Sequence, residues 1–232
     1  MKRLGLIGGM SWESTLPYYR LINQTVKAEL GGLHSAELIL WSVDFDPIER
    51  LQSAGDWHAA GAQLAEIARR LEAAGARGLV ICTNTMHKLA PQVEAAVGIP
   101  LLHIVDATGA VLRQASIQRV GLLGTRFTME QDFYRGRLAD RFGIESIVPE
   151  AAQRELVHRV IYEELCQGRI EPSSREAYRQ VMAELVAAGA QAIVLGCTEI
   201  ALLVAPEDSS VPLFDTTEIH ARQAARWALK TD

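Results

Sequence analysis

Short runs of apolar residues alternate along the chain with longer segments of helical periodicity. These runs predict strands over residues 4–7, 38–43, 79–82, 101–104, 144–148 and 192–195, of which 79–82 and 192–195 are apolar throughout. Continuous apolar runs of this length are typical of parallel strands that are buried on both faces. Between them, apolar residues recur every three or four positions, as in the segment from Trp57 to Leu71. The pattern therefore predicts an α/β protein in which strands and helices alternate.

The order of predicted elements starts again in the second half of the chain. Residues 3–8 read RLGLIG and residues 119–124 read RVGLLG. A second echo aligns Gly75 with Gly189, so that AAGARGLVICTNT matches AAGAQAIVLGCTE. We expect two similar lobes, each a four-stranded parallel sheet flanked by helices, related by pseudo-two-fold symmetry with the active site between them. The predicted boundaries are 1–105 and 106–214, with a C-terminal helix over 215–232 that packs on the first lobe.

Composition narrows the classes of function. The net charge is −5 and the basic residues are scattered, which argues against a nucleic-acid or anionic-membrane partner. Three cysteines do not suit a disulfide framework, so a reducing cytoplasm is expected. The first apolar run is too short for a signal peptide and is interrupted by Gly8 and Gly9, and no run approaches the length of a membrane span.

Polar clusters follow four of the predicted strands. They are Gly8-Gly9-Met10-Ser11, Cys82-Thr83-Asn84-Thr85, Gly124-Thr125-Arg126 and Gly196-Cys197-Thr198-Glu199. Ligands of parallel sheets bind beyond the carboxyl ends of the strands, so these clusters predict one pocket that is built from both halves. The first glycine turn lacks the dinucleotide fingerprint and the lysine of a phosphate-binding loop. It is either a tight turn or a set of backbone N–H groups that bind a carboxylate.

The phase of the repeat pairs Thr83, and not Cys82, with Cys197. A cysteine near a helix N-terminus can have a lowered pKa and act as base or nucleophile, whereas an isolated buried cysteine is more often a small apolar residue. Cys82 is expected to point to the opposite side of its strand from Thr83, and Cys166 is interpreted as structural. The histidines lack metal-ligand spacing and only one lysine, Lys88, lies near a cluster, so we predict neither a metal nor pyridoxal phosphate.

These motifs resemble the aspartate/glutamate racemase superfamily over essentially the whole chain. Thr83-Asn84-Thr85, Cys197-Thr198-Glu199 and the opening GLIGGMSWEST match that family, the last being typical of its aspartate racemase branch. The resemblance implies a cofactor-independent amino-acid racemase in which Thr83 and Cys197 exchange the α-proton on opposite faces of the substrate. Family members are often dimers, so a homodimer is an expectation. The implied substrate-binding residues are Met10, Gln52, Asn84, Thr85, Thr125, Thr198 and Glu199, with Gln52 on a loop.

One position departs from the family pattern, because Thr83 stands where a cysteine is usual. A threonine hydroxyl is a far weaker acid than a thiol, so unequal activity toward the two enantiomers is expected, with Cys197 removing the proton in the faster direction. Arylmalonate-type decarboxylases, maleate-type isomerases and non-catalytic amino-acid-binding proteins remain alternatives. The side-chain specificity stays open, because Arg126 is the only arginine in a cluster and Arg50 is a loop candidate.

Overall fold

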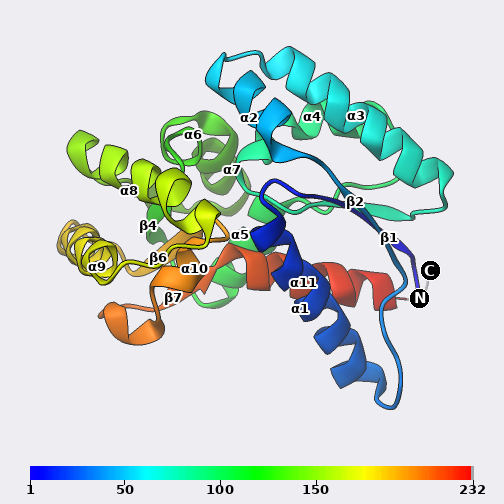
Figure 1. Cartoon of the computed structure of the whole chain (residues 1–232). Coiled ribbons are helices and arrows are strands. Elements are labelled where there is room, and N and C mark those ends of the chain that lie inside the picture. The colour runs from blue at the N-terminus through cyan, green and yellow to red at the C-terminus, as the bar shows by residue number, and fades with distance from the viewer. Residues whose placement is uncertain (231–232) are drawn as a thin grey trace. The chain divides into compact units, whose positions relative to one another are not determined.

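The computed structural model of the protein describes residues 1–230 and has the predicted α/β class (Figure 1). Its strands form two parallel sheets, one of three strands and one of four, flanked by helices. The chain divides into two compact units. Unit 1 contains Met1–His103 together with the chain from His220 onward, and unit 2 contains Ile104–Ile219. The helix predicted over 215–232 corresponds to α11, Thr216–Leu229, and positions 231–232 lie outside the described residues.

The sheet of unit 1 has the order β2-β1-β3. Its strands are β1 (Leu4–Gly8), β2 (Leu38–Ser42) and β3 (Gly78–Ile81). The helices between Met1 and His103 are α1 (Trp12–Leu30), α2 (Phe45–Ser53), α3 (Trp57–Ala73), the 3-10 helix η1 (Thr85–Leu89) and α4 (Ala90–Glu94).

The fourth strand predicted for this sheet, over 101–104, is reduced to a single bridge. Leu79 donates its N–H to the carbonyl of Pro100, and Leu102 donates to the carbonyl of Leu79, each at 2.9 Å. The chain then enters a helix at Ile104. Because the pairing stops after one residue, the first sheet has three strands where the sequence predicts four.

Both faces of this sheet are covered, which explains why its strands are apolar throughout. Ile7 and Ile81 pack with residues of α3, whereas Leu6 and Val80 pack with residues of α1 and α11. Figure 1 shows α3 on one face of the sheet and α1 with α11 on the other. The alternation of side chains along each strand therefore assigns successive residues to different helical layers.

The sheet of unit 2 has the order β5-β4-β6-β7. Its strands are β4 (Arg119–Gly124), β5 (Glu145–Ile147), β6 (Ala192–Gly196) and β7 (Leu213–Asp215). The helices are α5 (Ile104–Gln114), α6 (Arg126–Glu130), α7 (Asp132–Phe142), α8 (Ala151–Glu163), η2 (Leu165–Gln167), α9 (Pro172–Ala187), α10 (Ile200–Leu203) and η3 (Pro206–Asp208).

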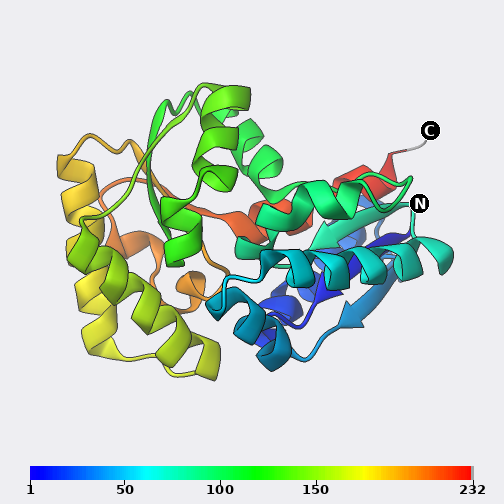
Figure 2. The same cartoon turned by 90° about the horizontal axis from the view of Figure 1, so that it is seen from above.

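The two faces of this sheet are also covered by different helices. Ile193 and Leu195 pack with residues of α8 and α9, whereas Leu122 and Val194 pack with residues of α5 and α7. Figure 2 shows α8 and α9 side by side, apart from α7. Within the described residues, no helix is long and apolar enough to cross a membrane.

Candidate active site

The turn after β1 is held in one conformation by its glycine and a threonine of α1. Gly9 has φ of 90°, and a Cβ at this position would lie 2.3 Å from the carbonyl oxygen of Val43. Its N–H donates to Thr15 Oγ1 at 2.8 Å, and that hydroxyl donates to the carbonyl of Ser11 at 3.0 Å. The Gly9 N–H therefore stabilises the turn itself and is not a free donor for a ligand carboxylate.

The turn after β3 contains the predicted Thr83 position. Thr83 is half-buried, Asn84 and Thr85 are buried, and the 3-10 helix η1 follows at once. His87 Nδ1 lies 2.7 Å from the carbonyl oxygen of Thr83. Because a carbonyl only accepts, Nδ1 carries the proton and donates it, which holds the Thr83 backbone against η1.

His87 also belongs to a cluster of buried rings in unit 1. Its ring centroid lies 4.6 Å from that of His103 and 5.6 Å from that of His220. His220 Nε2 donates to the Leu102 carbonyl at 2.6 Å, so its Nδ1 accepts from the hydroxyl of Tyr18 at 2.8 Å. Burial lowers the pKa of His220 to about 4, which keeps this ring neutral near pH 7.

Cys82 lies away from the polar turn. Its side chain is 1% exposed and packs in the apolar cluster with residues of α1 and α11, whereas Ile81 packs on the α3 face. Burial raises the pKa of the Cys82 thiol far above its usual range. Cys82 is therefore a core residue of the sheet, chemically inert at neutral pH.

Gln52 is close to the Thr83 turn, but the predicted loop around it is wrong. Residues 45–53 form helix α2, because Asp44 caps its N-terminus by accepting the N–H of Asp46 at 3.3 Å. Gln52 is 3% exposed, and its Nε2 donates to the sulfur of Met86 in η1 at 2.9 Å. Met10 packs in the same apolar cluster as Met86, so the predicted residues of unit 1 gather beyond the carboxyl ends of β1 and β3.

In unit 2, the turns after β4 and β6 lie side by side. Gly124 and Gly196 are register partners, and a Cβ on either residue would lie 2.8 Å from a backbone oxygen of the neighbouring strand. Thr125 follows Gly124 and caps α6, since its Oγ1 accepts the N–H of Thr128 at 3.3 Å. Cys197 follows Gly196, so Thr125 and Cys197 leave adjacent strands at the same edge of the sheet.

The carboxylate of Glu199 is directed at Cys197. Its Oε2 accepts from Cys197 Sγ at 3.0 Å and from Thr198 Oγ1 at 2.6 Å. Its Oε1 accepts from Cys166 Sγ at 3.6 Å. Glu199 is 3% exposed, so a buried carboxylate is surrounded by two thiols and a hydroxyl. The role of Cys166 is missed by sequence reasoning, because 33 positions separate it from Glu199 and no motif links them.

This environment corrects the expectation of a lowered pKa at Cys197. Burial raises the pKa of the Cys197 thiol well above its usual range, and the negative charge of Glu199 raises it further. The backbone N–H of Glu199 opposes this shift without cancelling it. Cys197 is therefore a protonated thiol at neutral pH, with a carboxylate oxygen in position to accept its proton.

The two arginine candidates are engaged at the surface. Arg50 lies on α2 and not on a loop, and it pairs with Asp46 at 3.0 Å. Arg126 lies 3.7 Å from Glu155 and is half-exposed. Neither observation assigns them to a ligand. Among residues 1–230, no group of three His, Cys, Asp or Glu side chains is arranged to hold a metal ion.

Comparison with known proteins decides the family. The profile of the Asp/Glu/Hydantoin racemase family matches residues 7–224. The chain belongs to this family. A candidate Asp/Glu racemase from Yersinia pestis shares 61% identity, with a TM-score of 0.93 over 99% of this chain and 100% of that one. An aspartate racemase homologue from Pyrococcus horikoshii shares 33% identity, with a TM-score of 0.85 over the same shares.

The fold is also that of more distant racemases. Picrophilus torridus aspartate racemase shares 21% identity, with a TM-score of 0.78 over 100% of this chain and 96% of that one, a likeness that concerns the fold alone. Membership of the Asp/Glu/Hydantoin racemase family supports an isomerase. The two α/β units match the two-lobed fold of these racemases.

Proposed function

We propose that the protein is a cofactor-independent amino-acid racemase in which Cys197 and Thr83 act on opposite faces of the substrate's α-carbon. The observation that carries the proposal is their equivalent placement. β1 pairs with β3 as β4 pairs with β6. The repeat that aligns Gly75 with Gly189 also aligns Thr83 with Cys197, and each of these two residues lies just beyond the equivalent strand of its unit, β3 or β6. Family membership supports the same reading.

Acidic amino acids are the first substrates to test. The relative from Yersinia pestis is described as an Asp/Glu racemase and that from Pyrococcus horikoshii as an aspartate racemase homologue. We propose L-aspartate and L-glutamate, as free amino acids without a bound cofactor. Neutral amino acids belong in the same assay, because both arginine candidates are engaged by acidic neighbours.

In the proposed mechanism, Glu199 first accepts the proton of the Cys197 thiol. The resulting thiolate removes the α-proton from one face of the substrate, and the carbanion accepts a proton from the Thr83 hydroxyl on the other face. Cys197 is then a thiol again, Glu199 releases the proton it holds to water, and water returns one proton to the Thr83 alkoxide, so that each group regains its starting protonation state. The 3.0 Å contact between Cys197 Sγ and Glu199 Oε2 supports the first transfer.

The Thr83 hydroxyl is better suited to donating a proton to the carbanion than to removing the α-proton of the substrate. An aliphatic hydroxyl loses its proton only to a strong base such as a carbanion, so its resting state cannot remove the α-proton efficiently. His87 acts here as a positioning residue through the Thr83 carbonyl. We therefore propose faster turnover for the enantiomer whose α-proton faces Cys197.

The decisive experiment compares two neighbouring variants. Deuterium incorporation and inversion at the α-carbon of both enantiomers of aspartate and glutamate are followed in deuterated water. We expect Thr83→Ala to slow inversion at least about 100-fold, since general acid catalysis contributes about 10² to 10⁴. Cys82→Ala removes one buried atom and should cost about 1 kcal/mol of stability with little change in turnover.

Thr83→Ser, which keeps the hydroxyl, is the matched control and should retain inversion. Loss of turnover in Cys82→Ala but not in Thr83→Ala would show that the assignment of the second base is wrong. Release of carbon dioxide from an arylmalonate would instead identify a decarboxylase. Saturable amino-acid binding without deuterium exchange would identify a binding protein.

A further inference from the structure

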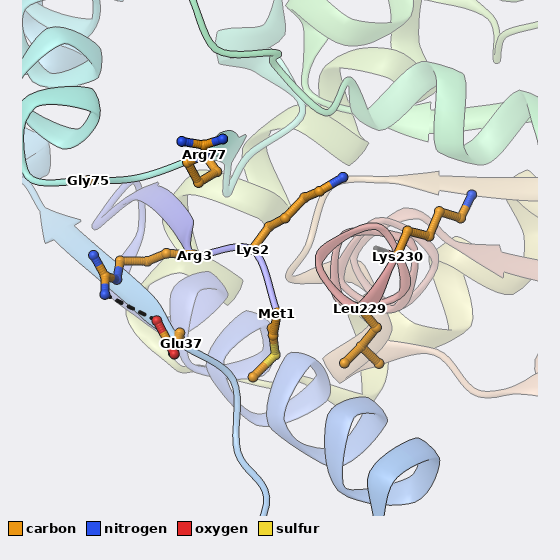
Figure 3. Close-up of a pocket in the computed structure, with 8 residues that line it drawn as sticks. All are labelled: Met1, Lys2, Arg3, Glu37, Gly75, Arg77, Leu229 and Lys230. Carbon is orange, nitrogen blue, oxygen red and sulfur yellow. Dashed lines mark hydrogen bonds and ion pairs between the residues drawn. The ribbon is translucent and has the colours of Figure 1, made fainter. Parts of the chain in front are cut away.

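Unit 1 has a hollow, called the basic hollow, at the end of its sheet opposite to the Thr83 turn. It has a volume of about 440 Å³ and is lined by Met1, Lys2, Arg3, Glu37, Gly75, Arg77, Leu229 and Lys230. Figure 3 shows these residues coming from the segments before β1, β2 and β3 and from the end of α11. Volumes of 300 to 1,000 Å³ are typical of small-molecule sites.

The walls of this basic hollow are fixed by main-chain hydrogen bonds. Lys2 donates its N–H to the carbonyl of Ala228, and Arg77 donates its N–H to the carbonyl of Arg3, each at 2.8 Å. These two hydrogen bonds join the backbones of three separate segments: the residues before β1, the end of α11 and the residues before β3. Such preorganisation lowers the entropic cost of binding a ligand to all three segments.

The charge of the hollow is opposite in sign to that of the protein. Among residues 1–230, four basic side chains line it, and Glu37, which pairs with Arg3 at 3.1 Å, is the one acidic residue in the lining. The protein as a whole carries a net charge of −5. Lys2 Nζ lies 5.0 Å from the centroid of the Trp227 ring, which orients that ammonium. Figure 3 shows Lys2 extended between Arg77 and Lys230.

The hollow lies at the amino-terminal edge of the strands. Lys2 and Arg3 precede β1, and Arg77 precedes β3, whereas the Gly9 and Thr83 turns follow these strands. β1 has five residues, so at about 3.3 Å per residue roughly 16 Å separate the two edges. A ligand in the basic hollow therefore does not occupy the place of the amino-acid substrate.

We propose that the basic hollow is a binding site for a small anion that carries two or more phosphate groups. Cations from separate segments suit a ligand with several anionic oxygens, because one carboxylate neutralises a single charge. Arg77 supplies planar paired donors and the ammonium group of Lys230 supplies a point charge, the combination that recognises phosphate. Free pyrophosphate and the diphosphate of a nucleotide share this chemistry.

Isothermal titration calorimetry of the full chain with pyrophosphate and with ADP tests the proposal. The variant Arg77→Gln/Lys230→Gln should weaken binding of both probes at least tenfold. Arg20→Gln/Lys27→Gln, which removes the same charge from exposed positions of α1, is the matched control and should bind within twofold of the wild type.

Equal affinity for the two probes would assign recognition to the phosphates alone, and at least tenfold tighter binding of ADP would point to a nucleotide. The absence of saturable binding at 150 mM salt overturns the proposal. Equal weakening by both double variants also overturns it, because it would reflect net charge and no site. The readout is binding, so it is independent of racemase activity.

Discussion

Replacement of Glu199 by glutamine separates the two effects of its carboxylate on Cys197. The carboxylate accepts the proton that Cys197 must lose, and its charge also raises the pKa of that thiol. Glu199→Gln keeps the shape of the side chain and removes both effects. The thiol should therefore ionise more readily while the enzyme turns over more slowly.

The expected loss of turnover follows from the geometry. Oε2 is the acceptor 3.0 Å from Cys197 Sγ, and an amide in its place is not a base. Removing a positioned proton acceptor costs about 10² to 10⁴ in rate, so kcat should fall at least about 100-fold. The free energy of unfolding should change less. The variant loses charge-assisted hydrogen bonds, about 1.5–3 kcal/mol each, but it no longer has to bury the negative charge of Glu199, and the two effects offset each other.

The reactivity of the Cys197 thiol should move in the opposite sense to turnover. Burial is the largest cause of its raised pKa and is unchanged in the variant, so the pKa stays above the usual range for a thiol. The contribution of the Glu199 charge disappears, so the pKa decreases. At any fixed pH between 7 and 9, alkylation of Cys197 should accordingly be faster than in the wild type.

Two assays check this pair of expectations. Site-resolved mass spectrometry follows iodoacetamide labelling of Cys197 across the pH range, and polarimetry or coupled chromatography follows racemisation. Glu163→Gln removes an exposed carboxylate and is the matched control. The reasoning fails if Glu199→Gln keeps kcat within threefold of the wild type, or if Cys197 becomes less reactive.

Two further predictions concern stability in unit 1. Gly9→Ala should destabilise the protein by more than Gly31→Ala. The Gly31 variant carries only the cost of a backbone conformation that favours glycine, about 1–3 kcal/mol, whereas at Gly9 the new Cβ would also meet the Val43 carbonyl oxygen at 2.3 Å. Equal losses in urea unfolding would contradict this expectation. His220 has a folded pKa of about 4 against 6.5, so its contribution to stability is complete above pH 6.5 and is lost as the pH falls toward 4. Urea unfolding at pH 8 and pH 5 should show a loss of about 2 kcal/mol in the wild type that is missing from His220→Gln, and identical losses would refute it.

Much of the candidate site is predictable because its residues are close in sequence. Asn84, Thr85 and Thr198 follow apolar strands directly, and a parallel sheet brings the carboxyl ends of its strands to one edge. The internal repeat alone selects Thr83, and not Cys82, as the equivalent of Cys197. The distinction matters because neighbouring residues of a strand point to opposite faces of the sheet. The predicted fourth strand of the first sheet is present only as a bridge, since the chain enters α5 at Ile104.

The sequence by itself determined the α/β class, the internal repeat, the family and the turns that carry the candidate chemistry, because all of these rest on local pattern and motif. Only the tertiary structure decided that Gln52 lies on a helix against Met86, and that Cys166 and Cys197 share the carboxylate of Glu199. It also decided that the Cys197 thiol is protonated at rest. The physical reason is that burial and through-space charge depend on residues far apart in the chain, and a local motif does not encode them.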